Sequence, residues 1–241
     1  MHVLLVPGLW LDASSWNDAR AALDAAGHHV RALTMPGTGG SETETAHIGM
    51  DEWVEAVVAE IDAASAPVVL VGHSAGGNVV YAAADRRPAL VAHVILLDTF
   101  PPAPGASIAE FPVLDGVVPF PRWDFFDDED VADISPAVRD RVQGRTGAVP
   151  ARVPTDPLHL HDERRHGIPL TIVSGTVPAA VIRSFASDPA PWAAELAAVQ
   201  DLRVVALHAE GEPGGHWPQF SAPAATGQAL AEAVAATPEL R

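Results

Sequence analysis

The chain alternates short, continuous apolar runs with longer segments in which apolar residues recur at helical spacing. Strands are predicted at residues 2–6, 29–33, 68–71, 93–97, 168–174 and 202–207, and those at 2–6 and 168–174 are expected to be buried on both faces. The helically spaced segments predict helices at residues 12–26, 51–64, 78–85, 179–186, 192–199 and 224–236. Strands and helices that alternate in this way are typical of a parallel sheet with helices on both faces, a doubly wound α/β fold.

Residues 101–167 interrupt this alternation. The segment is rich in proline and aromatic residues and lies between two predicted strands, so it is expected to be a lid inserted into a core made of residues 1–100 and 168–241. Aromatic side chains at this density usually line a cavity, although a surface excursion without a role is the alternative.

Composition narrows the classes of function. The 241 residues include no cysteine, which excludes disulfides, thiolate catalysis and cysteine-based zinc sites. The formal net charge is −17, and every basic residue is an arginine, so neither nucleic acid nor an anionic membrane is an expected partner. The apolar runs are too short to span a bilayer. The chain enters a core strand without a basic segment or cleavage site, so a cytoplasmic location is expected.

The most informative motif is Gly72-His73-Ser74-Ala75-Gly76, which joins a predicted strand to a predicted helix. The pattern G-x-S-x-G in this context is the nucleophile elbow, a sharp turn that lifts the serine hydroxyl above the sheet. The alternative is a glycine-rich turn with an ordinary serine. The strand and helix on its two sides favour Ser74 as a nucleophile.

A serine nucleophile needs a base, and His216 is the best candidate because it follows the last predicted strand in Gly214-Gly215-His216-Trp217-Pro218. His73 is expected to point away from Ser74. His159, His161 and His166 have nearly the spacing of metal ligands, but two arginines lie among them, so no metal and no cofactor is expected.

The acid that should orient His216 is absent from its usual place, since Ser174-Gly175-Thr176-Val177-Pro178 contains no carboxylate. Asp98 ends the preceding predicted strand on the same edge of the sheet and is the preferred candidate, with a turn-capping role as the alternative. Glu210 and Glu212 lie too near His216 in sequence to orient it easily.

An oxyanion formed at Ser74 needs two N–H donors, and the main-chain groups of Ala75 and Leu9 are predicted to supply them. Gly8 permits the tight turn that presents Leu9. The side chains expected to line the substrate pocket are Trp10, Phe100, Phe120, Trp123 and Trp217.

These motifs resemble the α/β-hydrolase superfamily over nearly the whole chain, and within it the lidded branch of salicylate-type methyl esterases and hydroxynitrile lyases. The matching pieces are Pro7-Gly8-Leu9-Trp10, Pro36-Gly37-Thr38-Gly39, the elbow, Leu97-Asp98-Thr99-Phe100 and Gly215-His216-Trp217-Pro218. The chain departs from the branch where Pro7-Gly8 replaces the common His-Gly and where the usual acid is missing.

The resemblance implies hydrolysis of a small, mostly apolar ester or lactone through an acyl-enzyme intermediate. Two alternatives remain: a non-catalytic receptor for a small molecule, and a lyase of the hydroxynitrile type. The lyases that the chain resembles use an active-site lysine, and this chain contains no lysine.

Overall fold

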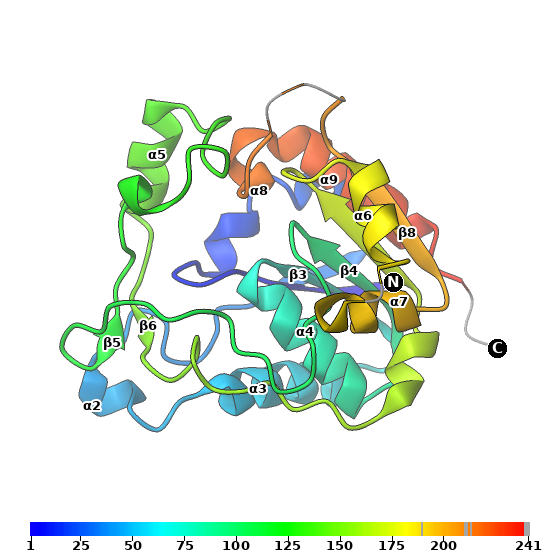
Figure 1. Ribbon diagram of the computed structural model, residues 1–241, viewed down its shortest axis with the longest axis horizontal. Helices are drawn as coiled ribbons and strands as arrows, with labels where there is room; N and C mark the ends of the chain where they lie inside the picture. The colour runs from blue at the N-terminus through cyan, green and yellow to red at the C-terminus, as the bar shows by residue number, and fades with distance from the viewer. Residues whose placement is uncertain (189, 210–211, 213, 239–241) are drawn as a thin grey trace.

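Six parallel strands form the central sheet in the part of the chain that the structure, a computed structural model, describes: residues 1–188, 190–209, 212 and 214–238 (Figure 1). The strands lie in the order β2-β1-β3-β4-β7-β8. Their bounds are β1 His2–Val6, β2 His29–Ala32, β3 Val68–His73, β4 Val91–Leu97, β7 Leu170–Ser174 and β8 Leu202–Ala206. The predicted α/β fold is confirmed, and the sheet is wholly parallel within the described residues.

The register of the sheet aligns the carboxyl ends of its strands. Val6 of β1 pairs with Gly72 of β3, His73 of β3 pairs with Leu97 of β4, and Leu97 pairs with Val173 of β7. The segments that leave these strands therefore start side by side along one edge, which is where open parallel sheets bind ligands.

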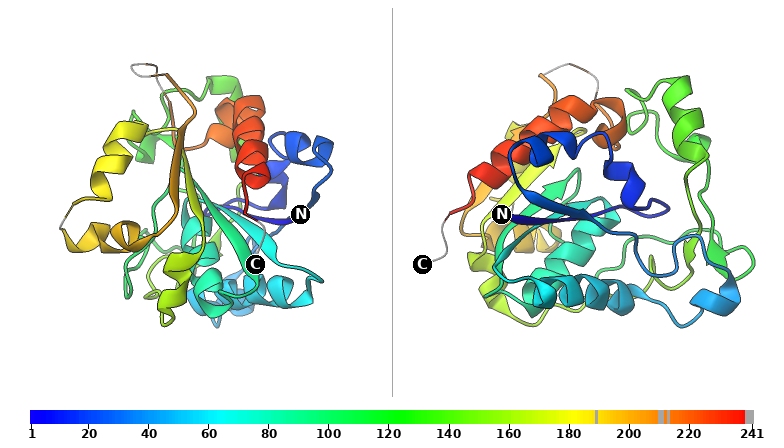
Figure 2. Two further views of the ribbon diagram at one scale, coloured as in Figure 1. Left: turned by 90° about the vertical axis from the view of Figure 1, so that its right-hand side faces the viewer. Right: turned by 180° about the vertical axis from the view of Figure 1, so that it is seen from behind.

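Side chains alternate along each strand between two apolar layers. Val3 and Leu5 face Leu23 of α1 and Leu230 of α9, whereas Leu4 and Val6 face the layer that contains α3 and α4. Figure 2 shows the sheet nearly edge-on, with α1 and α9 together on one side. Both faces of the sheet are covered, as continuous apolar strands require.

The helices are α1 Ala21–Ala25, α2 Glu42–Thr45, α3 Met50–Ala63, α4 Ala75–Arg86, α5 Pro136–Gln143, α6 Ala179–Phe185, α7 Ala194–Ala198, α8 Pro218–Ser221 and α9 Pro223–Ala235. Short 3₁₀ turns occur at Ala13–Trp16 (η1), Trp123–Phe125 (η2), Glu163–Gly167 (η3) and Pro191–Ala193 (η4). None of the helices formed by described residues is long and apolar enough to cross a membrane.

The single helix predicted at residues 12–26 is wrong. The segment forms the 3₁₀ turn η1 and, after a break, the short helix α1. Asp12 accounts for the first turn, because its side chain accepts hydrogen bonds from the main-chain N–H and the hydroxyl of Ser14. Gly27 follows α1 with a φ of 78°, the left-handed conformation expected of a residue just past a helix.

The insert between β4 and β7 contains a two-stranded antiparallel sheet, β5 Val117–Val118 and β6 Val149–Pro150, together with α5. In Figure 1 these elements lie on the side of the molecule opposite α6 and α7. Helix α5 begins at Pro136, because the side chain of Ser135 caps it and proline suits its first position.

A buried ion network ties the end of the insert to the core. Arg165 in η3 donates to Glu195 of α7 at 2.6 and 3.0 Å and to Asp85 of α4 at 3.0 Å. Tyr81 also donates to Glu195 at 2.9 Å, and the main-chain N–H of His161 donates to Asp85. The three charged groups are almost inaccessible to solvent. The cost of burying each charge is therefore offset by its attraction to the opposite charges in the network.

We predict that Arg165→Met lowers the free energy of unfolding by about 3–5 kcal/mol, because two buried carboxylates lose their cation. Arg164→Met is the matched control: Arg164 is the neighbouring residue but pairs with Asp162 at the surface, so its loss should change little. Urea denaturation of the two variants makes the comparison. Equal stability of the two would contradict a structural role for the network.

Candidate active site

Ser74 lies in a strained turn between β3 and α4. Its φ is 51° and its ψ is −124°, a conformation that residues with side chains rarely adopt. The glycines on either side make the turn possible, since a Cβ on Gly72 would collide with the carbonyl of Gly76, and a Cβ on Gly76 with the carbonyls of Val6 and Pro7. The Gly-x-Ser-x-Gly spacing is therefore a packing requirement here.

Ser74, His216 and Asp98 form one hydrogen-bonded row. The Ser74 hydroxyl lies 2.8 Å from His216 Nε2, and His216 Nδ1 lies 2.7 Å from Asp98 Oδ2. Since a carboxylate only accepts, Nδ1–H is the donor to Asp98, and Nε2 is left to accept from Ser74. This is the arrangement in which an imidazole can remove a proton from a serine hydroxyl.

Asp98 is held in place by the loop that carries no acid of its own. Its Oδ1 accepts from the main-chain N–H of Gly175 at 2.8 Å and from the N–H and hydroxyl of Thr176 at 2.9 and 3.0 Å. Burial acts to raise the pKa of Asp98, but the hydrogen bond and charge of His216 and these N–H groups outweigh it and hold the pKa below its usual value. Asp98 is therefore an ionised group facing His216.

The main chain of His216 is also fixed. Its N–H donates to the carbonyl of Asp130 in the insert at 2.8 Å. Its carbonyl lies 2.7 Å from His73 Nε2, and His73 Nδ1 lies 3.1 Å from the side-chain amide of Gln219. Both nitrogens of the His73 ring thus have partners other than Ser74, and the ring holds the loop of His216.

The main-chain N–H groups of Leu9 and Ala75, near Ser74, are the predicted donors to an oxyanion. Neither Leu9 nor Ala75 has a hydrogen-bond acceptor for its N–H within the described residues. Ala75 begins α4, where the helix dipole favours negative charge. Gly8 approaches so closely that a Cβ there would meet the side chains of His73 and Ser74, and this brings the Leu9 turn beside the hydroxyl.

Two cavities adjoin Ser74. The cavity on the His216 side, about 230 Å³, is lined by Trp10 and Trp217 and by Phe111, Phe126 and Asp130 from the insert. The other, about 350 Å³, is lined by residues that include Asn78, Phe100 and Trp192. The first is slightly smaller than usual small-molecule sites and the second is at the lower end of their size range, so the two together suit a small ligand.

Three of the five residues predicted to line the pocket, Trp10, Phe100 and Trp217, adjoin these cavities. Phe120 and Trp123 line neither; they pack behind the cavity against Phe126, and the Trp123 indole N–H donates to the carbonyl of Arg139. Phe111, Phe126 and Asp130 were missed, because neither the insert's composition nor its spacing distinguishes a residue facing the cavity from one behind it.

The remaining candidates lie apart from Ser74. His159 and His161 stack on each other, and His166 bonds to Glu195. Within the described residues, no group of histidine and acidic side chains is arranged to hold a metal ion. Glu212 accepts from the main chain of Ala209, and Glu210 lies outside the described residues.

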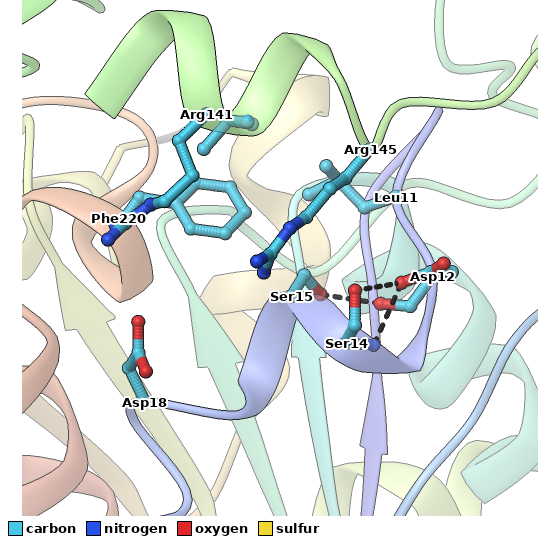
Figure 3. A pocket seen from close by; sticks show the side chains of 9 residues that line it. Leu11, Asp12, Ser14, Ser15, Asp18, Arg141, Arg145 and Phe220 are labelled. Carbon is cyan, nitrogen blue, oxygen red and sulfur yellow. Dashed lines mark hydrogen bonds between the residues drawn. The ribbon is translucent and has the colours of Figure 1, made fainter. Parts of the chain in front are cut away.

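A further hollow, shown in Figure 3, lies where α5 of the insert meets η1 and α8. Arg141 and Arg145 border it, as do Ser14 and Ser15. Both serine hydroxyls donate to Asp12, to its carboxylate and to its carbonyl respectively, and no histidine is among the described residues that line the hollow. The hollow therefore marks the place where the insert packs against the core, and it holds no second serine–histidine pair within the part of the chain that the structure describes.

The sequence model of the alpha/beta hydrolase family matches residues 3–229, so the chain belongs to this family. Among curated proteins, Esterase PIR7B of Oryza sativa subsp. japonica is 37% identical over 108 residues, which cover 43% of this chain and 40% of that protein. The Carbendazim hydrolyzing esterase of Nocardioides sp. (strain SG-4G) is 34% identical over 113 residues, 44% of this chain and 45% of that protein. The matched part thus spans less than half the length of these relatives.

Solved structures resemble the whole chain. The methylesterase MES16 from Arabidopsis has a TM-score of 0.73 at 18% identity and covers 98% of this chain and 99% of its own. An extracellular alpha/beta-hydrolase from a Paenibacillus species has a TM-score of 0.72 at 18% identity and covers 100% of both chains. Together with the family match and the esterases among the curated relatives, these structures confirm the predicted resemblance to the esterase branch of the superfamily.

The buried His73 generates a prediction about stability and pH. Burial, with a contribution from the charge of His216, lowers the pKa of His73 to about 3, although its bond to the His216 carbonyl and the charge of Asp98 oppose this. Between about pH 6.5 and 3, His73 is protonated in the unfolded chain, where a histidine pKa is about 6.5, but is neutral in the folded chain. Stability from this group is therefore complete above pH 6.5 and is lost as the pH falls toward 3.

We predict that His73→Gln flattens this dependence. Between about pH 6.5 and 4, the free energy of unfolding of the unmodified protein should fall more steeply than that of the variant, by up to about 1.4 kcal/mol per pH unit. His93, also buried with a lowered pKa, is present in both proteins and cancels in the comparison. Urea denaturation at several pH values measures it, and parallel curves would contradict the prediction.

Proposed function

We propose that this protein is a serine esterase that cleaves a small, mostly apolar carboxylic ester or lactone through an acyl-enzyme intermediate. The observation that carries the proposal is the hydrogen-bonded row from Ser74 through His216 to Asp98, with both hydrogen bonds between 2.7 and 2.8 Å. The esterases among the curated relatives and the aromatic cavities beside Ser74 support it.

In the proposed reaction, His216 Nε2 takes the proton of the Ser74 hydroxyl while Oγ attacks the ester carbonyl carbon. The N–H groups of Leu9 and Ala75 bind the oxyanion. As the tetrahedral intermediate collapses, His216 returns the proton to the leaving oxygen. Water, activated by the same imidazole, then releases the acid and restores Ser74. Asp98 stabilises the imidazolium throughout.

The insert of residues 101–167 acts as a lid in this proposal, since it contributes Phe111, Phe126 and Asp130 to the cavity beside His216. A small molecule is the partner. The intact pairing of Ser74 with His216 favours catalysis over a receptor role, and the absence of lysine disfavours a lyase of the hydroxynitrile type.

We predict that Ser74→Ala lowers the turnover of p-nitrophenyl butyrate by several orders of magnitude, because no nucleophile remains to form the acyl-enzyme. The unmodified protein should release a burst of p-nitrophenol equal to the enzyme concentration. Ser15→Ala is the control, since its hydroxyl is held by the Asp12 carbonyl. Labelling by a fluorophosphonate at a serine other than Ser74 would contradict the assignment, and no burst with any short ester would favour a receptor.

We predict that Asp98→Asn lowers kcat by up to about 10⁴-fold. The asparagine oxygen would keep the N–H groups of Gly175 and Thr176, so its NH₂ would face His216 Nδ1 and force the tautomer that carries its proton on Nε2. That imidazole cannot accept the serine proton.

Thr176→Val is the matched control, because it removes one donor to the Asp98 carboxylate but leaves the carboxylate itself. Its kcat should fall less than about tenfold, in line with the loss of a single hydrogen bond. Steady-state kinetics with thermal melting of both variants separates catalysis from folding. If Asp98→Asn kept a kcat like that of Thr176→Val, Asp98 would be a turn cap only.

A further inference from the structure

The cavity on the His216 side of Ser74 is an aromatic box. Trp10 meets Phe111 at 5.0 Å between ring centroids and 84° between planes, and Phe126 at 5.9 Å and 69°. Phe126 meets Trp217 at 4.7 Å and 76°. All four residues line the cavity. The rings therefore contact one another edge to face and form a continuous aromatic lining beside Ser74, and the faces of such rings carry partial negative charge.

One carboxylate borders this box. Asp130 lines the cavity and is half-buried, and its side chain has no hydrogen-bond or ion-pair partner among the described residues. The nearby Asp133 differs, since its carboxylate accepts from Ser221 at 2.6 Å. The position of Asp130 is well defined, because its carbonyl accepts from the N–H of His216.

The surroundings of Asp130 disfavour its negative charge, so a cation bound beside it would be stabilising. Burial raises its pKa above the usual value, and the carboxylates of Asp98, Asp127 and Glu129 act in the same direction against the attraction of His216. The exposed residues Asp127, Asp128 and Glu129 precede it in sequence, and the whole chain has a net charge of −17. Such a field draws cations toward the site and repels anionic substrates.

Aromatic faces combined with a carboxylate are the chemistry that binds alkylammonium groups. We propose that the ester cleaved by this protein carries an ammonium group on its alcohol part, held by Trp10, Phe126 and Asp130. This inference rests on the esterase function proposed above and narrows its substrate class from a mostly apolar ester or lactone to an open-chain ester with a cationic alcohol part.

The alcohol part is assigned to this cavity by the proton that the leaving oxygen must receive. His216 lines this cavity and not the one bordered by Asn78, Phe100 and Trp192. When Ser74 Oγ forms its bond to the carbonyl carbon, the bond from that carbon to the alcohol oxygen breaks, and the oxygen takes the proton from His216 Nε2. The products are the carboxylic acid, after water attacks the acyl-enzyme, and the cationic alcohol.

A matched pair of substrates tests the proposal. Butyrylcholine and 3,3-dimethylbutyl butyrate have the same shape, but a neutral carbon replaces the quaternary nitrogen in the second. We predict that kcat/KM is about tenfold higher for the cationic ester at low salt, mainly through KM, and that the ratio shrinks as ionic strength rises. A ratio near one at low salt would overturn the proposal.

Asp130→Asn tests the carboxylate itself. It keeps the main-chain carbonyl that holds His216 and should reduce the ratio of the two kcat/KM values by about fivefold or more. The ratio is insensitive to a general loss of rate, because both esters use the same Ser74 and His216. Asp128→Asn removes the same charge from an exposed position outside the cavity and should leave the ratio nearly intact. If both variants lowered the ratio equally, the preference for the cationic ester would come from the net charge of the protein, and the role of Asp130 would be overturned.

A second measurement needs no variant. Choline should inhibit hydrolysis of p-nitrophenyl butyrate at a concentration about tenfold lower than 3,3-dimethylbutanol does. Equal inhibition overturns the proposal even if Asp130→Asn fails to fold. If both neutral and cationic esters are cleaved through Ser74 without preference, the esterase function stands and only the cationic substrate class fails. If neither ester is cleaved and no serine is labelled, both proposals fail together.

Discussion

The loop of His216 is the point on which the candidate site depends, because it is held from several directions at once. Asp98 holds its ring, His73 holds its carbonyl, and the carbonyl of Asp130 holds its N–H. These bonds reach the loop from β4, from the end of β3 and from the insert. A change in the position of the insert would therefore move the imidazole relative to Ser74, and a shift of 1 Å is enough to impair such a geometry.

Backbone strain accumulates at the same edge of the sheet. Trp10, Ser74 and Asp98 have φ values of 65°, 51° and 49°, and they follow β1, β3 and β4 respectively. Residues with side chains adopt this region at a cost of about 1–3 kcal/mol each, and the surrounding packing must hold them there. The two apolar layers that bury both faces of these strands supply that packing. The rigid core thus maintains the turns that direct the cavity wall, the hydroxyl and the carboxylate toward one another.

The regular part of the fold could be predicted from apolar patterning, since the buried strands are continuous apolar runs and the longer helices show apolar residues at helical spacing. The predicted strand at residues 2–6 has the bounds of β1, and the predicted helix at 51–64 differs from α3 by one residue at each end. The predicted helix at residues 12–26 failed because the side chain of Asp12 bonds to its own following main chain, a local competition that helical spacing does not reveal.

For the candidate site, the sequence by itself determined the neighbourhood of Ser74, His216 and Asp98, because parallel strands bring their carboxyl ends to one edge of a sheet. Only the tertiary structure decided the rest. The loop at Gly175 and Thr176 lacks an acid yet supplies the donors that hold Asp98, and the insert directs Phe111, Phe126 and Asp130 into the cavity but Phe120 and Trp123 behind it. An irregular segment has no period that relates sequence position to direction, so its side chains take their places only when the segment packs against the core.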